Sequence, residues 1–341
     1  MASIPDFSVR DLKLQEITKL AHENWELPDI KLPSLVPVAK AFRANIARVR
    51  FLMLLPTSIA GGMALTQRVN DIAEFEVTGS VVQDESSIAS NVAVKITKRR
   101  SEILGAHNAA TLARMGQSDW DEKAGEFHFA AAKSLDGLTE TPIGAYGFLD
   151  ILVAHTTGTW TAIETMLGDL WEAALNAHPD VLSSLKGNAT RTNSSSKGAF
   201  DQSNAKLELK SIPLSLVEKH RFDLRSSMGS IFRQQRRFEF TRLSSIREAY
   251  ASAFSEKFGR IDKALGNKAL DELSAVRNVM VHRAGFADPE YMGKLRRLDI
   301  PKSELGKPVL LDGENVSKLI RNAIGTSKDL MIAVEDWITR Y

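Results

Sequence analysis

One segment near the middle of the chain, residues 148–175, sets the strongest constraint on the fold. Large apolar side chains recur in it at spacings of three and four residues, which places them on one face of a long α-helix. This face carries Trp160, Ile163, Leu167, Leu170, Trp171 and Leu175. We interpret the two tryptophans as packing residues, because they bury a large apolar area in a core or an interface. The segment favours an all-α fold.

The chain beyond residue 213 continues this helical pattern. Apolar residues at helical spacing predict further helices over 214–233, 240–258, 268–283 and 315–340. Gly259 and Gly285 are the expected ends of the second and third, because glycine adopts the left-handed conformation that commonly ends a helix. Helices of this length joined by modest loops predict an up-and-down bundle.

Residues 1–140 form a less regular N-terminal region of unknown role. We expect it to be mostly helical, with helices over 35–55 and 119–135. The alternation of Val92, Val94 and Ile96 with Ala93 and Lys95 instead predicts a short strand, which would belong to a strand pair.

Two polar segments predict breaks in the helical pattern. Residues 136–147 combine glycine, threonine and Pro142, and they mark the expected boundary between the N-terminal region, 1–140, and a C-terminal domain, 141–341. Residues 186–204 are rich in serine, asparagine and glycine and predict a loop inside that domain.

The composition excludes several functional classes. The chain has no cysteine, so disulfides, catalytic thiols and thiolate metal sites are ruled out. The seven histidines show no clustered ligand spacing, and we expect neither a metal nor a cofactor. The 44 basic and 42 acidic residues nearly cancel, so any nucleic acid must bind a local patch.

The longest apolar stretch, Phe51–Leu65, is too short to span a bilayer and contains Pro56. We interpret it as a buried core segment. The N-terminal residues contain charges that interrupt any signal-peptide pattern. We therefore expect a cytoplasmic protein that contacts no membrane.

The hexapeptide RNVMVH, residues 277–282, combines a cation and a titratable group near the end of a predicted helix. Arg277 and His282 are five residues apart, about 140° around the axis, among apolar neighbours. A buried arginine needs a partner, and a phosphate serves as well as a carboxylate. Histidine transfers protons near neutral pH. An arginine that holds a phosphate and a histidine that moves a proton suffice to cleave RNA without a metal, with Asn278 orienting the sugar or the histidine.

The spacing alone is a weak signal, because Arg100 and His107 satisfy a looser version of it. The longer sequence RNVMVHRAGFADPEYM, however, resembles the signature of the HEPN superfamily: an arginine, a polar residue that is often asparagine, and a histidine a few positions on. The preceding tryptophan-bearing helix, Asp288 and the closing helix also lie where such a domain has them. The resemblance covers roughly residues 145–341.

HEPN domains are four- or five-helix bundles, and many are endoribonucleases that act as dimers with their two motifs facing each other. The resemblance implies that Arg277, Asn278 and His282 are catalytic and that the chain forms a homodimer acting on RNA. Such a ribonuclease would be a toxin or antiviral defence effector. Because an unrestrained ribonuclease would harm its host, we also expect a regulatory or antitoxin protein as a partner. Arg283 is either an additional phosphate contact or a cation that interacts with the helix dipole.

A basic patch precedes the motif. Residues 219–247 contain eight basic residues against two acidic ones, interleaved with Phe232, Phe238 and Phe240. We expect RNA contacts from Arg233, Arg236, Arg237 and Arg242, with the aromatic rings stacking on bases. The other members are Lys219, Arg221, Arg225 and Arg247. The alternative is a solvated helix face whose phenylalanines point into the core.

A non-catalytic interaction module is the competing hypothesis for the whole chain. Some HEPN proteins bind nucleotides or pair with a nucleotidyltransferase, and the stripe containing Trp160 and Trp171 would then be the docking surface. Burial of Arg277 against a carboxylate such as Asp271 or Glu272 would favour this alternative.

Overall fold

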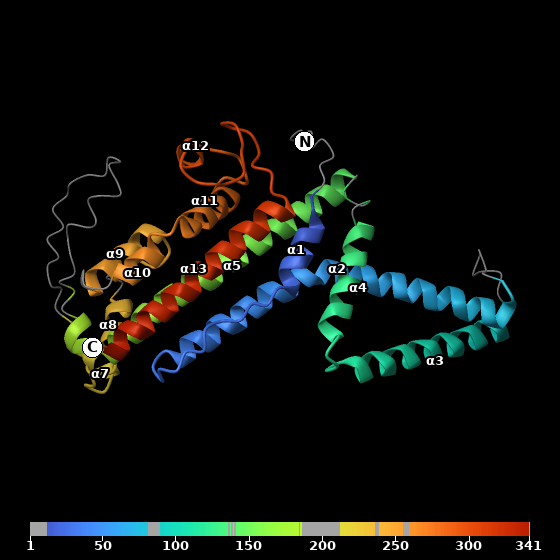
Figure 1. The fold of residues 1–341 in the computed structure, drawn as a ribbon, viewed down its shortest axis with the longest axis horizontal. Coiled ribbons are helices and arrows are strands. Elements are labelled where there is room, and N and C mark those ends of the chain that lie inside the picture. Colours follow the sequence, from blue (N-terminus) through green and yellow to red (C-terminus); the bar gives the residue numbers. More distant parts are fainter. Residues whose placement is uncertain are drawn as a thin grey trace. The chain divides into compact units, whose positions relative to one another are not determined.

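The computed structural model describes residues 12–80, 89–135, 141–183, 212–235, 239–254 and 259–340, together with residues 137, 139 and 185. Within these ranges the regular structure is helical and no strand occurs, which confirms the all-α prediction (Figure 1). A single β-bridge pairs Phe286 with Pro308. The helices are α1 Leu14–His22, α2 Val36–Thr78, α3 Ser90–Arg114, α4 Trp120–Leu135, α5 Pro142–Ala177, α6 Pro179–Leu182, α7 Leu214–Lys219, α8 Met228–Gln234, α9 Leu243–Ala253, α10 Gly259–Leu265, α11 Lys268–His282, α12 Pro289–Leu295 and α13 Gly313–Arg340.

The described residues divide into two compact units. Unit 1 contains the described residues up to Asn24, Arg50–Asp150 and Asp312–Glu314, and unit 2 contains Trp25–Val49, those of Ile151–Leu311, and the remainder of α13. Residues 25–49 therefore pack in unit 2, although the sequence groups them with the N-terminal region. The predicted domain boundary near residue 140 stays a prediction.

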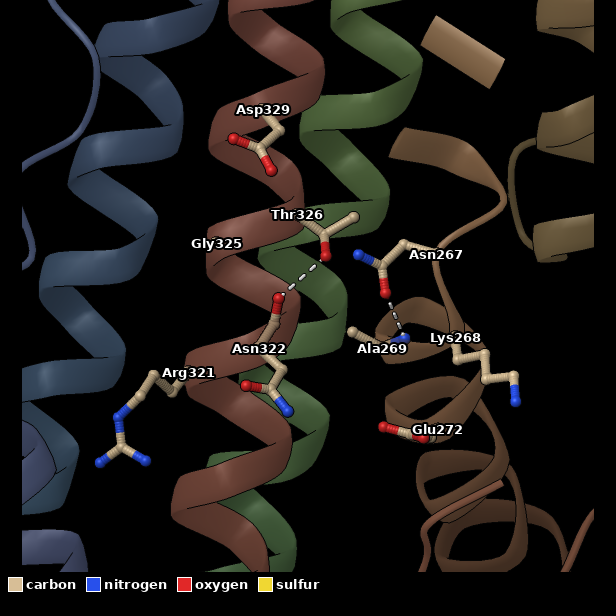
Figure 2. Close-up of a pocket in the computed structure, with 9 residues that line it drawn as sticks. All are labelled: Asn267, Lys268, Ala269, Glu272, Arg321, Asn322, Gly325, Thr326 and Asp329. Carbon is tan, nitrogen blue, oxygen red and sulfur yellow. Dashed lines mark hydrogen bonds between the residues drawn. The ribbon is translucent and has the colours of Figure 1, made fainter. Parts of the chain in front are cut away.

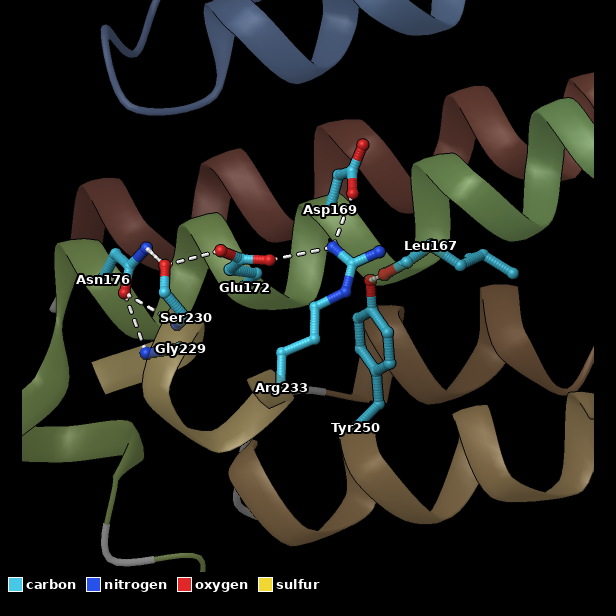
Figure 3. Close-up of polar contacts among 8 residues, drawn as sticks. All are labelled: Leu167, Asp169, Glu172, Asn176, Gly229, Ser230, Arg233 and Tyr250. Carbon is cyan, nitrogen blue, oxygen red and sulfur yellow. Dashed lines mark hydrogen bonds and ion pairs between the residues drawn. The ribbon is translucent and has the colours of Figure 1, made fainter. Parts of the chain in front are cut away.

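Unit 2 is built around α5, the helix expected from the central apolar segment. α13 runs beside α5 in all three views (Figures 1–3). Trp160 and Trp171 are 1% and 0% exposed. Their packing role is confirmed, and the alternative of a docking surface on these tryptophans is wrong, because neither ring reaches the surface. The indole of Trp171 donates a 2.9 Å hydrogen bond to the Ala249 carbonyl of α9, which attaches α9 to α5.

α8 approaches α5 closely because Gly229 has no side chain. A Cβ atom built on Gly229 would lie 2.2 Å from the Glu172 carbonyl oxygen. Asn176 accepts a 2.8 Å hydrogen bond from the Gly229 amide, and Ser230 donates one of 2.5 Å to the Glu172 carboxylate (Figure 3). These contacts fix α8, and with it Arg233, against the surface of α5.

Unit 1 contains the long helices of the N-terminal region. α1 packs on α4, and the His22 imidazole lies 3.0 Å from that of His128. The end of α2 is joined to α3 by two ion pairs, Glu74 with Arg100 at 2.7 Å and Glu76 with Arg99 at 2.5 Å. Arg100, part of the looser Arg/His match, thus pairs with a carboxylate of α2.

The short strand predicted at residues 92–96 is wrong, because these residues form the first turns of α3. Only Ile96 is buried in this helix, whereas Val94 is 69% exposed. Five alternating residues are too few to specify a strand when no second strand is available to pair with them. The residues that follow, TKRRSEILGAHNAATLAR, favour a helix, and that helix includes residues 92–96 as its N-terminal turns.

Several predicted helix limits also differ from the structure. α5 begins at Pro142, inside the segment predicted as a boundary, since proline is well accepted in a first helical turn. The helix predicted over 214–233 is two short helices, α7 and α8. Gly259 begins α10 rather than ending α9, which stops at Ala253.

The prediction that Phe51–Leu65 is a buried core segment is wrong. This stretch forms the middle of α2, and Phe51 and Met63 are 72% and 69% exposed. By length and composition α2 is also the one helix of the described residues that is apolar enough to cross a membrane, and 22% of its most apolar stretch is buried. The cytoplasmic location stays a prediction.

Candidate functional site

The candidate site lies at the C-terminal end of α11, in unit 2. At the start of α11 the Asn267 side chain accepts a 3.0 Å hydrogen bond from the Ala269 amide. Val276 and Val279 are buried, which fixes the rotation of the helix about its axis. After the last turn Gly285 has a φ of +80°, and its amide donates a 3.0 Å bond to the Val279 carbonyl. The expected left-handed glycine at residue 285 is confirmed.

The structure brings the three predicted catalytic residues together. The Arg277 Nη1 atom lies 3.0 Å from the Asn278 Oδ1 atom and 3.1 Å from the His282 Nε2 atom. Arg277 and Asn278 are partly buried, whereas His282 is exposed. The guanidinium therefore spans the last turn of α11 and reaches solvent beside the imidazole.

The contact between Arg277 and His282 defines the state of the imidazole. A guanidinium has only N–H donors, so the Nε2 atom of His282 must accept the hydrogen bond. A neutral His282 consequently carries its proton on Nδ1, and the Nε2 lone pair is directed at Arg277. A stronger acceptor that withdrew the guanidinium would leave this lone pair available to take a proton.

A carboxylate of α5 that the sequence did not single out, Glu164, interacts electrostatically with Arg277. Burial raises the pKa of Glu164, while the Arg277 cation and a hydrogen bond from Trp160 oppose that rise. No ion pair of Arg277 occurs in the described part of the chain, so Glu164 interacts with it through the field alone. A sequence signal did exist, because Glu164 lies four residues after Trp160 on the α5 face that packs in unit 2.

The two carboxylates named in the competing hypothesis are committed elsewhere. Asp271 receives two hydrogen bonds from Arg247, of 2.9 and 2.8 Å. Glu272 is buried and accepts a 3.1 Å bond from the Asp299 amide. Neither of them neutralises Arg277.

Arg283 points away from the cluster. Its Nε atom donates a 2.9 Å bond to Asp288, whose other carboxylate oxygen accepts from the Tyr291 amide at the start of α12. The Tyr291 amide and Arg283 lower the pKa of Asp288, which keeps it charged. Arg283 thereby connects the end of α11 to α12, and its role as a phosphate contact stays a prediction.

The basic patch is only partly a free cationic surface. Arg233 donates to Asp169 at 2.5 Å and to Glu172 at 2.8 Å (Figure 3). Its guanidinium lies 5.8 Å from the centre of the Phe240 ring. Two carboxylates thus compensate its charge. Arg242, by contrast, is exposed at the start of α9.

Two of the aromatic residues in the patch also have a packing role. Phe232 is buried, and the Phe240 ring lies 5.4 Å from that of Trp171, so these two rings serve packing. Arg236, Arg237 and Phe238 lie outside the described residues. RNA binding by Arg236, Arg237 and Arg242 stays a prediction, whereas Arg233 has a structural role.

A pocket of about 450 Å³ lies at the opposite end of α11, between its first turn and the middle of α13 (Figure 2). Its lining carries charges of both signs, from Lys268 and Arg321 on one hand and Glu272 and Asp329 on the other. Its lining residue nearest to Arg277 along α11 is Glu272, which lies five residues, or about 7.5 Å of helix, away. Its lining does not include Arg277, Asn278 or His282.

Comparison of the chain with family models, with curated proteins and with solved structures found no match in any of the three.

Proposed function

We propose that this chain is a metal-independent endoribonuclease with Arg277, Asn278 and His282 as its catalytic residues. The observation that carries the proposal is the 3.1 Å contact between the Arg277 guanidinium and the His282 imidazole at an exposed helix end. One group binds phosphate and the other moves protons, within reach of a single nucleotide. The likeness of RNVMVHRAG to the HEPN signature supports the same activity.

Phosphate binding initiates the proposed reaction. The RNA phosphate is a stronger acceptor than a neutral imidazole, so Arg277 exchanges its bond to His282 for a bidentate contact with two phosphoryl oxygens. This exchange releases the Nε2 lone pair of His282 at the moment when substrate arrives. Asn278, which holds Arg277 in the free protein, keeps the guanidinium at the site.

The released Nε2 atom then accepts the proton of the ribose 2′-hydroxyl. The 2′-oxygen attacks the adjacent phosphorus, and the bond from phosphorus to the 5′-oxygen breaks. Arg277 stabilises the negative charge that builds on the phosphoryl oxygens. Water protonates the departing 5′-oxygen, and His282 returns its proton to solvent. The products are a 2′,3′-cyclic phosphate and a 5′-hydroxyl end.

The proposed enzyme is a homodimer whose two motifs share one cleft. Val281 and Phe286, on either side of His282, are 50% and 43% exposed. Apolar side chains of this size beside polar catalytic groups favour a second protein surface over solvent. A toxin or antiviral defence effector, held inactive by a regulatory or antitoxin protein, is the setting we propose for this activity.

The test incubates the purified chain with mixed RNAs in EDTA and maps the new ends. We expect 2′,3′-cyclic phosphates, and we expect Arg277→Gln or His282→Asn to reduce the rate by a factor of about 100 or more. Arg260→Gln is the matched control, because Arg260 pairs with Asp336 of α13 and belongs neither to the cluster nor to the basic patch.

Equal cleavage by wild type and both variants would show a contaminating nuclease and overturn the proposal, provided that circular dichroism shows an intact fold. Dependence on dimerisation is measured separately. Specific activity should fall on dilution below the dissociation constant, whereas activity per subunit that is independent of concentration would reject the shared cleft.

A further inference from the structure

In the middle of α2 the large apolar side chains are mostly exposed and the buried residues are mostly smaller, which is the reverse of what an isolated globular unit favours. On the face packed within unit 1, Met53, Thr57 and Gly61 are buried. The opposite face, about 200° around the axis, carries Phe51, Leu55, Ile59 and Met63, which we call the α2 stripe. These side chains are 72%, 51%, 55% and 69% exposed. The larger and more apolar face is the one in solvent.

The buried face is already occupied, so the helix cannot turn its stripe inward. The ring of Phe127 from α4 lies against Gly61, where a Cβ atom would be 2.2 Å from the ring carbon Cζ. The Ser58 hydroxyl lies 3.2 Å from the Nε2 atom of His128, which also belongs to α4. Rotation of α2 would place Phe51 and Ile59 where glycine and small polar residues now fit. The stripe is therefore a fixed outer surface.

The charge of this part of the chain has one sign. Between Asp29 and Asp71 the sequence contains six basic residues and no acidic residue. The basic residues are Lys31, Lys40, Arg43, Arg48, Arg50 and Arg68. From Phe51 to Gln67 no charged residue interrupts the apolar sequence. An apolar helix face in a purely basic segment is the combination that anionic lipid surfaces attract.

We propose that the α2 stripe binds the surface of an anionic lipid bilayer, with α2 lying in the plane of the headgroups. The apolar side chains enter the interface, and the exposed basic residues of α2 interact with lipid phosphates and carboxylates. These are Lys40, Arg43, Arg48 and Arg68, whereas Arg50 donates to the Ala21 carbonyl. α2 lies flat rather than crossing the bilayer, because α4 covers its other face. This departs from the expectation that the chain contacts no membrane.

A second copy of the chain fits the stripe less well. Two stripes packed against each other would bring two purely basic segments together without a carboxylate between Asp29 and Asp71 to compensate them. Repulsion of this kind disfavours self-association and favours an anionic surface. The experiment below therefore distinguishes binding of a second copy from binding of lipid.

The test floats the full-length protein with vesicles on a density gradient. We expect it to float with vesicles of phosphatidylcholine and phosphatidylserine in equal parts, and at least about tenfold less with phosphatidylcholine alone. Binding should weaken in high salt, and alkaline carbonate should release the protein. Replacing the stripe by serine at all four positions, or Met63→Asp alone, should abolish flotation.

Val94→Ser combined with Leu112→Ser is the matched control, since both are exposed apolar residues of α3, 69% and 67%, outside the stripe. This double variant should bind as the wild type does. No flotation of the wild type, or equal flotation of the stripe variant, would overturn the proposal. Resistance to carbonate would also overturn it, because it indicates a helix that spans the bilayer. A dimer that forms without lipid and is lost in the stripe variant would overturn it too, because it indicates that a second copy binds the stripe. RNA cleavage does not enter these readouts, so the two proposals fail independently.

Discussion

The Arg277 guanidinium donates to the Nε2 atom of His282 at 3.1 Å, across the last turn of α11. Both residues lie within α11, whose last residue is His282, and the long arginine side chain bridges the distance between them. A regular helix would keep residues five apart about 140° from each other around the axis. The contact thus depends on the reach of the arginine side chain as well as on the spacing of the motif.

This contact predicts the tautomer of His282. In the free protein at neutral pH the proton should reside on Nδ1, because Nε2 accepts from a group that has only donors. The measurement is a long-range ¹H–¹⁵N correlation spectrum of the imidazole nitrogens. Arg277→Gln should shift the population toward the form protonated on Nε2, which free imidazole side chains favour. A wild-type ring protonated on Nε2 would contradict the phosphate-exchange mechanism.

Arg233 and Arg242 should respond differently to substitution. Arg233→Ala leaves Asp169 and Glu172 without their cation, so it should lower the free energy of unfolding by about 1–2 kcal/mol, given that the pair is only partly buried. Arg242→Ala should leave stability within about 0.5 kcal/mol and weaken RNA binding. Urea unfolding and RNA titration at two salt concentrations separate these effects. Equal loss of stability in both variants would contradict the assignment.

Gly229 predicts a packing defect that can be measured directly. Gly229→Ala places a methyl group against the Glu172 backbone, which cannot move away as a flexible side chain could. We expect a loss of about 1–3 kcal/mol in the free energy of unfolding. Gly147→Ala is the control, because no atom lies within 4 Å of its added Cβ and alanine favours the helix, so stability should rise by up to about 1 kcal/mol. Thermal unfolding of the two variants should move in opposite directions.

The sequence predicts long amphipathic helices well and their limits poorly. The stripe that ends at Trp171 and Leu175 specifies α5 because burial of one face decides the structure over many turns. Residues 92–96 mislead because five residues sample too short a stretch of that pattern. Gly259 misleads because glycine starts and ends helices, and only the neighbouring packing decides which.

The cluster of Arg277, Asn278 and His282 follows from local sequence, whereas its surroundings do not. Glu164 is more than 100 residues away, and only the tertiary fold brings it close enough to interact electrostatically with Arg277. The pairing of Arg233 with Asp169 and Glu172 is likewise a tertiary contact, and composition alone presents that arginine as a free cation. At Phe51 the sequence predicts burial and the structure shows exposure, because hydropathy does not indicate which face of an apolar helix is packed.

The imidazoles of His22 and His128 join α1 to α4 in a way that depends on pH. Ser58 donates to the Leu54 carbonyl, so its oxygen accepts from the Nε2 atom of His128, and the His128 Nδ1 atom accepts from His22 at 3.0 Å. Protonation of both imidazoles would set two N–H donors against each other. Burial lowers the pKa of both histidines, and the Arg50 cation lowers that of His22 further, against an opposing effect of Asp121.

Acid should therefore loosen α1. Each histidine has a lower pKa in the folded chain than its unfolded value of 6.5, so the unfolded state binds more protons as the pH falls. The stabilisation is complete above that value and is lost as the pH falls through the lowered values. Hydrogen exchange of the α1 amides, corrected for intrinsic rates, should show less protection at about pH 5.5 than at about pH 7.5. His128→Gln should remove most of this difference, and the exposed His107→Gln in α3 should keep it. If α1 protection is the same at both pH values in the wild type, the two imidazoles do not couple the helices as their geometry indicates.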